Sequence, residues 1–329
     1  MEVELLFKIC TRENHTRFLV KCNGEYKSIK ISNNLEHEIG EVISVEQNKI
    51  EDSKEKWEKR YEKYLSSMKF IKEHFIQYAV SKNLNIGGTY NGKSYEHILQ
   101  KKEDNLLLNL GYDESLKKYY NQLSNHIHKG FAHLNSSQAF AVNFFVPLIA
   151  ELENGNNLFN DLLDMDLQDI KVENCEFEKE LDDKTQLDFY LKAGSRDFTF
   201  EVKYSENSFG SAEKDEQHQI KYNDYYKQKL TEIISDFNYS SFEDTFYEEY
   251  QLWRNLCGLC EPNRTVCFVF PKFRVDLEEI IEEAKKKLKS EELRNRVKIL
   301  KVDDYIEKQL KSTSYKYYSE FKEKYLDLN

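Results

Sequence analysis

Two short runs of alternating apolar and polar residues near the middle of the chain predict a pair of neighbouring β-strands. The first run covers residues 186–191 and the second covers residues 198–203, with the cluster Ala-Gly-Ser-Arg-Asp at 193–197 between them. A turn-forming cluster between two alternating runs predicts a hairpin. Because successive side chains of a strand point to opposite faces, the apolar residues of both runs share one face and the polar residues share the other.

The polar face of this predicted hairpin carries side chains suited to phosphodiester chemistry. Asp188 lies on the first strand, and Glu201 and Lys203 lie on the second. Two carboxylates supply hard oxygen ligands for Mg²⁺, which stabilises developing negative charge and lowers the pKa of a bound water. A lysine beside such a metal orients the attacking water or neutralises the transition state. The alternative is an ordinary solvated strand face.

A third alternating run precedes the hairpin and offers a further acid. Residues 170–180 alternate so that Cys175 and Phe177 face inward and Glu176, Glu178 and Glu180 face outward. The run predicts a strand that completes a three-stranded meander. Glu178 is the candidate third acid, and the alternative is a charged outer face in which no single glutamate has a special role.

An apolar stretch before these strands predicts a helix that begins near Asn135 and continues through residues 139–149. Asn135 and Gln138 have the spacing of a capping box, with Asn in the place of Ser or Thr. Pro147 lies inside the pattern and predicts a kink or an early end of the helix. The predicted order of elements is therefore α-β-β-β, with the acidic residues on the strands.

The arrangement D…E-x-K on adjacent strands after a helix resembles the PD-(D/E)xK nuclease superfamily. Three blocks further resemble a family of bacterial restriction-endonuclease-like proteins within it: HLNSSQA at 133–139, EVKYSE at 201–206 followed by Phe-Gly at 209–210, and YQLWRN at 250–255. The blocks stand in that family's order and the resemblance covers roughly residues 130–272. Leu187 precedes Asp188 where the motif name has proline, a departure that is frequent in this superfamily.

The resemblance implies roles for the candidate catalytic residues. Asp188 and Glu201 correspond to metal-binding positions, and Lys203 corresponds to a catalytic position. Glu178 and Gln138 are implied to line the same site, with Glu178 as a third metal ligand. The metal is expected to be Mg²⁺ or Mn²⁺.

Three further residues are implied to support this site, namely Glu206, Gln251 and Arg254. Gln251 and Arg254 are expected on a helix beside the sheet, where they hold the site together or touch the nucleic-acid backbone. The alternative is an arginine paired with a buried carboxylate such as Glu206.

The whole pattern predicts an α/β (α+β) protein with a restriction-endonuclease-like core, in which helices flank a central mixed sheet. Alternating runs and an Asn-Gly turn at 23–24 predict a small β-rich N-terminal module, and helical periodicity predicts additional helices at 51–82, 95–99 and 113–126. Four regions follow along the chain: the β-rich module at 1–50, a helical region at 51–130, the nuclease-like core at 131–305 and a C-terminal helix at 306–329.

Composition narrows the class of protein. The 329 residues carry a formal net charge of −11, which argues against a general nucleic-acid coat protein but leaves room for a nuclease with a local basic groove. The chain has neither an apolar run of membrane-spanning length nor a basic segment at its start, so we expect neither a membrane span nor a signal peptide. Its six scattered cysteines are typical of free thiols in a reducing cytoplasm.

Two other motifs suggest different chemistry. Residues 87–94 match the phosphate-loop pattern G-x(4)-G-K-[ST], but the polar segment before them does not predict the buried strand that a nucleotide site needs, so a surface turn is favoured. His126, His128 and His133, and the lone CxxC at 257–260, lack the partners of a zinc site. We expect His133 to approach the active site beside Gln138.

Together these patterns predict a Mg²⁺- or Mn²⁺-dependent nuclease of the restriction or phage-defence type, with DNA favoured over RNA as the substrate. The alternative function is a non-cleaving nucleic-acid-binding or interaction protein on a nuclease-like fold, and the complete Asp, Glu and Lys set argues against it. Residues 1–50 are the expected contact for a second copy of the chain or for a partner protein.

Overall fold

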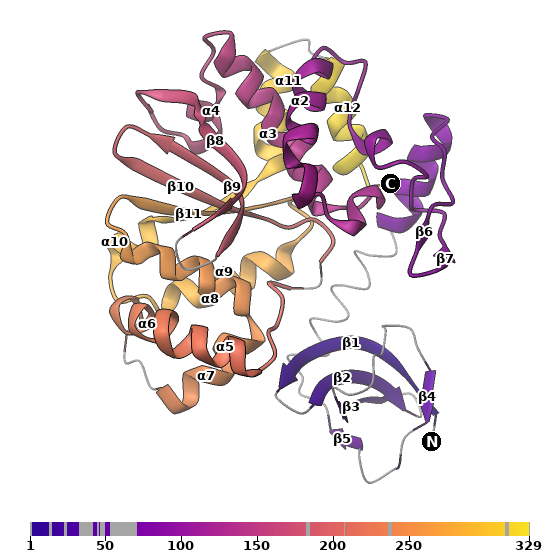
Figure 1. The fold of residues 1–329 in the computed structure, drawn as a ribbon, viewed down its shortest axis with the longest axis vertical. Coiled ribbons are helices and arrows are strands. Elements are labelled where there is room, and N and C mark those ends of the chain that lie inside the picture. The colour runs from indigo at the N-terminus through magenta and orange to yellow at the C-terminus, as the bar shows by residue number, and fades with distance from the viewer. Residues whose placement is uncertain are drawn as a thin grey trace. The chain divides into compact units, whose positions relative to one another are not determined.

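The computed structural model describes residues 2–12, 15–22, 25–32, 42–44, 46, 50–52, 71–181, 185–206, 208–235, 239–312 and 316–328 (Figure 1). The chain forms two compact units. The first unit contains Met1–Ser66, Asn207–Cys260 and Asp276–Arg294, and the second contains Ser67–Glu206, Glu261–Val275 and Asn295–Asn329. The predicted α/β class, with a mixed sheet flanked by helices and a small β-rich N-terminal region, is confirmed.

The first unit begins with a five-stranded antiparallel sheet in the order β4-β1-β2-β3-β5. Its strands are β1 Glu2–Arg12, β2 His15–Cys22, β3 Glu25–Ser32, β4 Val42–Ser44 and β5 Ile50–Asp52. Apolar side chains of these strands form a core of their own, made by Val3, Leu5, Phe18, Val20, Ile29 and Ile31. Cys22 pairs with Glu25, as a two-residue hairpin connection requires, although residues 23–24 lie outside the described residues.

The other elements of the first unit are helical. They are α5 Glu216–Lys221, the π-helix η5 Tyr222–Tyr226, α6 Lys227–Ile233, α7 Tyr239–Glu248, α8 Tyr250–Leu256, η6 Cys257–Cys260, α9 Val275–Lys286 and α10 Glu291–Asn295. The CxxC pair lies in η6, after α8, and both of its cysteines are free thiols.

The second unit contains the predicted meander within a five-stranded mixed sheet, in the order β12-β11-β10-β9-β8. The strands are β8 Ile170–Glu180, β9 Gln186–Ala193, β10 Arg196–Val202, β11 Arg264–Phe270 and β12 Val297–Lys301. β8, β9 and β10 are antiparallel neighbours, whereas β10, β11 and β12 run parallel. The predicted hairpin is confirmed, because Ala193 pairs with Arg196 across a two-residue turn in which Gly194 has a φ of 57°.

The remaining elements of the second unit surround this sheet. They are a helix over residues 71–81, the short strands β6 Thr89–Tyr90 and β7 Lys93–Ser94, η2 Lys102–Asn105, α2 Asp113–Leu123, η3 Ser124–His126, η4 Lys129–Ala132, α3 Ser137–Glu153, α4 Leu158–Leu163, α11 Val302–Ser312 and α12 Lys316–Tyr325.

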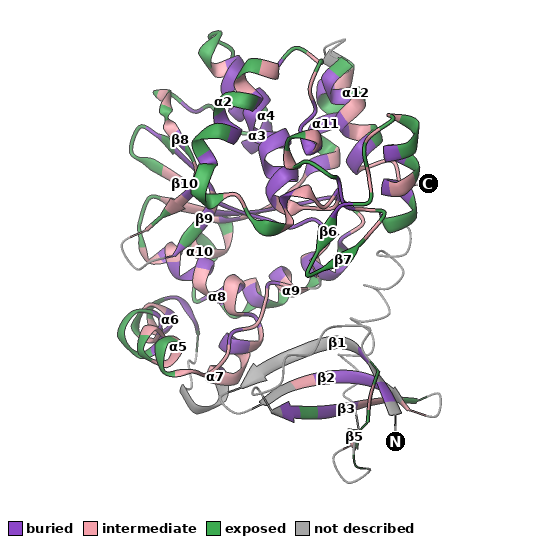
Figure 2. Cartoon of the chain, turned by 45° about the vertical axis from the view of Figure 1, so that its right-hand side comes forward, coloured by how far each residue is buried: buried purple, intermediate pink, exposed green. Residues whose placement is uncertain are grey.

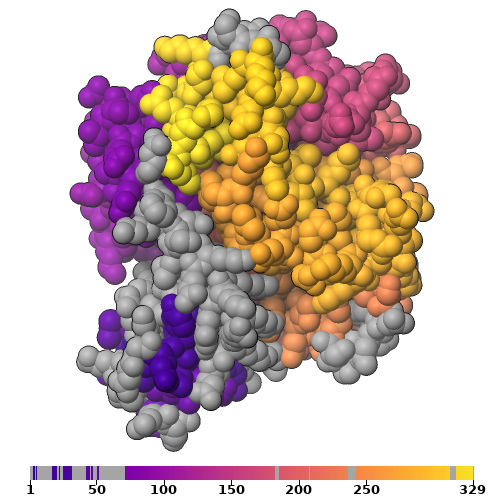
Figure 3. Space-filling view, turned by 180° about the vertical axis from the view of Figure 1, so that it is seen from behind, coloured from indigo at the N-terminus to yellow at the C-terminus, as the bar shows by residue number. Residues whose placement is uncertain are grey.

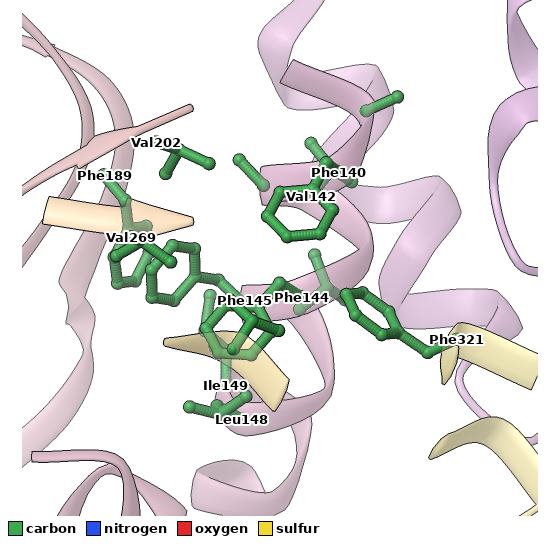
Figure 4. Packing of buried hydrophobic residues seen from close by; sticks show 14 of the residues in the cluster. Phe140, Val142, Phe144, Phe145, Leu148, Ile149, Phe189, Val202, Val269 and Phe321 are labelled. Carbon is green, nitrogen blue, oxygen red and sulfur yellow. The ribbon is translucent and has the colours of Figure 1, made fainter. Parts of the chain in front are cut away.

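Helix α3 is the centre of the second unit's hydrophobic core. It is buried all round, because the sheet covers one side and the C-terminal helices cover the other (Figures 1 and 4). The ring of Phe145 stacks on Phe189 of β9 at a centroid distance of 4.0 Å, and on the other side Phe144 lies 5.9 Å from Phe321 of α12. Burying one such side chain contributes about 1.5–3 kcal/mol. This packing fixes where the N-terminus of α3 lies relative to the strands.

The sequence predicted that Pro147 would either end the helix early or kink it. An early end is wrong, because α3 continues to Glu153. Proline has no N–H to donate to the carbonyl four residues earlier, which belongs to Asn143. The hydroxyl of Tyr317 donates a hydrogen bond of 2.7 Å to that carbonyl instead. A side chain from α12 therefore replaces the missing backbone hydrogen bond, and the helix tolerates its proline.

Two expectations for the region before α2 need correction. The helix predicted at 51–82 is wrong for residues 51–52, which belong to β5, and is confirmed for residues 71–81, and residues 53–70 lie outside the described part. The helix predicted at 95–99 is wrong, because Ile98 and Leu99 form β-bridges with His133 and Ile86. Five residues are too few to sustain a helix without strong packing.

The phosphate-loop pattern at 87–94 forms a surface hairpin, as favoured from the sequence. β6 and β7 pair across Asn91 and Gly92, both with positive φ, and all four strand residues are exposed (Figure 2). A nucleotide site of this type needs a buried strand directly before the loop and a helix directly after it. Neither element adjoins residues 87–94 in the structure.

The C-terminal segment packs against the start of the second unit. The Tyr78 hydroxyl donates a 2.7 Å hydrogen bond to Glu320, and Lys82 forms a 2.8 Å ion pair with the same carboxylate. Figure 3 shows the C-terminal segment in yellow beside purple segments of the chain. Lys324 is buried there and donates to both oxygens of Asn105, and burial lowers the pKa of its amine to about 7.

The Tyr317–Asn143 hydrogen bond yields a stability prediction. We expect Tyr317→Phe to reduce the free energy of unfolding by about 1–2 kcal/mol, because it leaves a buried carbonyl without its donor. In a Pro147→Ala background residue 147 supplies its own N–H, so the same substitution should cost less. Urea unfolding of the four proteins measures both costs, and equal costs in the two backgrounds would contradict this account of how the helix tolerates Pro147.

Candidate active site

Strands β8, β9 and β10 bring the predicted acidic residues together within the second unit. In the antiparallel register of β8 and β9, Glu178 lies between two paired positions and faces Asp188. On the other side of β9, the backbone N–H of Val202 donates a 2.6 Å hydrogen bond to the Asp188 carboxylate. Asp188 is therefore placed between the strand that carries Glu178 and the strand that carries Glu201.

Lys203 and Glu201 form a buried ion pair. The Lys203 amine lies 2.9 Å from a Glu201 carboxylate oxygen, and the two side chains are 7% and 3% exposed. Asp188 is partly exposed. The alternative of a solvated strand face is thus wrong for Glu201 and Lys203. A buried pair of this kind is costly to desolvate, which is why such pairs are more typical of functional sites than of ordinary strand surfaces.

The charges of this group act on one another. Burial, followed by the negative charge of Glu201, raises the pKa of the Asp188 carboxyl well above its usual range, and the positive charge of Lys203 offsets only part of this effect. Burial likewise raises the pKa of Glu178. Burial alone would lower the pKa of the Lys203 amine, but the charges of Glu201, Glu206 and Asp188 outweigh it and the pKa is raised. Lys203 is therefore protonated at neutral pH.

Glu178 differs from the two glutamates that share its predicted face. Glu176 and Glu180 are exposed, whereas Glu178 is buried. Glu178 also has a φ of 51°, in the left-handed region that non-glycine residues seldom adopt. Its carboxylate accepts a hydrogen bond from the Gln138 side chain. Strain of this type costs on the order of 1–3 kcal/mol and is found mostly at functional sites.

Gln138 connects the start of α3 to this group. Its amide nitrogen donates to a Glu178 oxygen at 2.6 Å and to the His126 carbonyl at 2.8 Å, and its amide oxygen accepts from the His128 N–H at 2.9 Å. The predicted capping box of Asn135 and Gln138 is wrong. Ser136 caps the helix through Ala139, and Asn135 instead donates to the Ser205 hydroxyl at 2.7 Å.

Glu206 ties the end of β10 to the same helix. Its carboxylate accepts a 2.5 Å hydrogen bond from the Ser137 hydroxyl and a 3.0 Å hydrogen bond from the Tyr204 N–H. Arg274 holds this segment from the other side, donating to the backbone carbonyls of Tyr204 at 2.8 Å and of Glu206 at 2.5 Å. The two sequence blocks at 133–139 and 201–206 therefore meet directly in the structure.

The third block lies in the first unit. Its residues Gln251 and Arg254 belong to α8, and Arg254 lies over the ring of Tyr250 at 5.8 Å. The Gln251 N–H donates to the Phe209 carbonyl at 3.0 Å, and the Gln251 side chain covers Gly210 so closely that an added Cβ would come within 3.0 Å of its amide oxygen. The second and third blocks thus meet within that unit. A supporting role for Gln251 and Arg254 at the acidic site stays a prediction.

Sequence patterns missed several residues that surround the site. His126 lies 3.3 Å from Gln186, and His128 lies 3.9 Å from the Glu178 carboxylate. The ring of His133 packs edge-on against Tyr90 of the surface hairpin, and its approach to the active site stays a prediction. The signal for His126 and His128 was present as a histidine cluster, but only the fold shows which members reach the acids.

The carboxylates of this group are better suited to Mg²⁺ than to a metal ion that is coordinated mainly by protein side chains. Within the described residues, no group of three or more His, Cys, Asp or Glu side chains is arranged so that it could hold a metal ion, and Glu178 as a third metal ligand stays a prediction. Mg²⁺ is typically bound by one or two carboxylates, with waters and substrate phosphate completing its shell. Asp188 and Glu201 can provide such a pair, and their mutual repulsion is the effect that a divalent cation relieves. The residues present therefore fit the predicted ion.

The model of one protein family, described as Restriction Endonuclease associating with ARP, matches residues 72–326. The chain belongs to this family. No curated protein and no solved structure matches the chain. The matched range includes Glu178, Asp188, Glu201 and Lys203, so the restriction-endonuclease-like resemblance noted from the sequence is confirmed. Among the residues that the structure describes, no helix is long and apolar enough to cross a membrane.

The left-handed backbone at Glu178 can be tested by stability alone. We expect Glu178→Gly to be more stable than Glu178→Ala by about 1 kcal/mol, because alanine pays a steric penalty at positive φ that glycine avoids. Both variants lose the Gln138 hydrogen bond, so that loss cancels. Glu176 is the matched control, since its φ is ordinary and the order should reverse there. Chemical denaturation that ranks alanine above glycine at both positions would refute the strained conformation.

The raised pKa of Asp188 predicts how stability depends on pH. The folded protein holds the Asp188 proton more tightly than the unfolded chain, so this contribution to stability is complete below about pH 4 and is lost as pH rises through the higher pKa of the folded state. Asp188→Asn does not titrate and keeps an acceptor for Val202. We expect the variant and the parent to be similar near pH 4 and the variant to gain relative stability toward neutral pH, as measured by urea unfolding in EDTA. A pH-independent difference would contradict this expectation.

Proposed function

We propose that this protein is a Mg²⁺- or Mn²⁺-dependent nuclease that hydrolyses phosphodiester bonds of DNA, in restriction or phage defence. The family to which the chain belongs supports a nuclease. The observation that carries the finer proposal is the group of three acids and one lysine on three adjacent strands, with a buried Lys203–Glu201 pair at 2.9 Å and an Asp188 carboxyl whose pKa is raised by burial and by Glu201.

Each residue has a part in the proposed reaction. Asp188 and Glu201 would hold the cation, with Glu178 as a third acid next to Asp188. When bound, Mg²⁺ supplies charge stabilisation at the phosphate and lowers the pKa of a coordinated water. Desolvated carboxylates bind such an ion only when they are ionised, so cation binding should release the proton that the raised pKa of Asp188 favours.

Lys203 is better suited to stabilise charge than to remove a proton. Its raised pKa keeps the amine protonated, and a protonated amine donates hydrogen bonds and accepts none. In this state Lys203 can orient the attacking water through the water's oxygen or neutralise the phosphorane-like charge of the transition state. Glu206 contributes part of the negative charge that keeps Lys203 protonated, which gives it a supporting role consistent with its contacts.

The partner of this nuclease is a second element of the proposal. The family description names association with ARP, so we infer that this chain also works with a partner protein. The β-rich module formed by β1–β5 is the proposed contact, either for that partner or for a second copy of the chain. It has a core of its own, as a separate recognition module needs.

The proposed activity predicts that Lys203→Ala abolishes DNA cleavage. We expect a loss of at least about 100-fold in the rate of plasmid nicking in Mg²⁺, because a buried charge that faces the developing negative charge is removed. The matched control is Lys192→Ala, which removes an exposed lysine from the neighbouring strand β9 and should leave cleavage unchanged. Supercoiled and linear DNA, single-stranded DNA and RNA are compared in Mg²⁺ and in Mn²⁺.

Calorimetric titration with Mg²⁺ separates the proposal from the alternative of a non-cleaving binding protein. We expect the parent to bind the ion and Asp188→Ala to lose binding. Cleavage retained by a folded Lys203→Ala variant would refute the assigned role of the lysine. A parent that binds nucleic acid but neither Mg²⁺ nor Mn²⁺ would instead favour the non-cleaving alternative.

A further inference from the structure

Beside the acidic site lies a short basic segment, His126, Ile127, His128 and Lys129, which we term the 126–129 loop. It connects η3 to η4, and both histidines and Lys129 are exposed. Ile127 has an extended backbone and its side chain packs against the core of the second unit. His126 and His128 flank Ile127 and both are exposed, so their side chains lie at the surface of the second unit.

The loop is held in position by the catalytic group itself. Gln138 donates to the His126 carbonyl and accepts from the His128 N–H, so one side chain fixes the backbone at both histidines. The same amide donates to Glu178 at 2.6 Å. His128 lies 3.9 Å from the Glu178 carboxylate. The exposed His128 imidazole is therefore close to the predicted metal site. The Gln138 side chain holds both the loop and Glu178.

Charge explains why a phosphate-binding element is needed at this point. The site gathers Glu178, Asp188 and Glu201 against one lysine, and the whole chain has a net charge of −11. This balance repels a nucleic-acid backbone, whose binding depends on local positive charge. The 126–129 loop supplies three exposed nitrogen-bearing side chains at the edge of the site. An imidazole N–H can donate a hydrogen bond to a phosphate oxygen.

We propose that the 126–129 loop binds phosphates of the nucleic-acid backbone next to the scissile bond, and that Gln138 is a positioning residue that holds this loop against Glu178. His128 and Lys129 meet phosphates, and His126 extends the contact toward β9, where Gln186 lies 3.3 Å from its ring. This inference rests on the proposed nuclease function and adds to it the surface by which the substrate is held.

The test is a binding measurement that does not require cleavage. The loop variant His126→Gln/His128→Gln/Lys129→Gln is compared with the parent by fluorescence anisotropy of a short labelled DNA duplex in Ca²⁺, over a range of salt concentrations. The control variant is Lys171→Gln/Lys192→Gln. It removes two positive charges from exposed positions of β8 and β9, and Lys171 lies seven residues from Glu178, roughly 20 Å along the strand.

We expect the loop variant to bind at least about tenfold more weakly and to reduce the slope of log K against log salt by about 1, because Lys129 is the one lysine among the three replaced residues and only positively charged contacts release counterions. Gln138→Ala should lower the same slope, which a merely structural loss of stability would not do. The control variant should match the parent.

The outcomes separate this inference from the function on which it rests. A parent that binds DNA, together with a loop variant that has the same affinity and the same salt slope, overturns the loop and leaves the nuclease proposal standing. A control variant that loses as much affinity as the loop variant also overturns it, because the effect would then reflect net charge alone. A parent that binds neither duplex, single-stranded DNA nor RNA overturns both proposals.

Discussion

The packing of helix α3 against the mixed sheet is the constraint on which the rest of the second unit depends. The stacked rings of Phe145 and Phe189 fix the helix over β9, and the same apolar contacts fix where its first turn lies. That turn carries Ser137 and Gln138, whose hydrogen bonds reach Glu206, shortly after β10, and Glu178, near the end of β8. A hydrophobic interface therefore sets the geometry of a polar site, because the polar residues occupy the end of the element that the interface holds rigid.

The site concentrates several features that lower stability. Glu178 has a strained backbone, Asp188 and Glu201 repel each other, and the Lys203–Glu201 pair is buried. None of these features contributes to the core, and each costs free energy that the surrounding packing must offset. Residues that served only the stability of the fold would not be expected to combine these costs on three adjacent strands. Such a combination is the pattern expected at a site that binds a cation and an anionic substrate.

The sequence predicted what depends on period and spacing and missed what depends on single dihedral angles and distant partners. The β9–β10 hairpin was predictable because alternation and a glycine turn are local signals. The continuation of α3 past Pro147 was not, since it relies on a hydroxyl from Tyr317, which is 170 positions later in the chain. The burial of Glu178 also escaped prediction, because alternation treats Glu176, Glu178 and Glu180 alike, and neither the positive φ of Glu178 nor its contact with Gln138 has a local sequence signal. Arg274 gave no local signal, because its guanidinium donates to the backbone carbonyls of Tyr204 and Glu206, which lie 70 and 68 positions earlier in the chain.

The three sequence blocks acquire a physical meaning in the structure. Residues 133–139 and 201–206 meet through Asn135–Ser205 and Ser137–Glu206, and residues 209–210 meet 250–255 through backbone hydrogen bonds. The middle block therefore belongs to both units, since the boundary between them falls after Glu206. Glu206, which carries part of the first contact set, lies only three positions before Phe209, which carries part of the second. The two contact sets are thus joined by a short stretch of chain, which explains why the residues of the middle block stand so close together in the sequence.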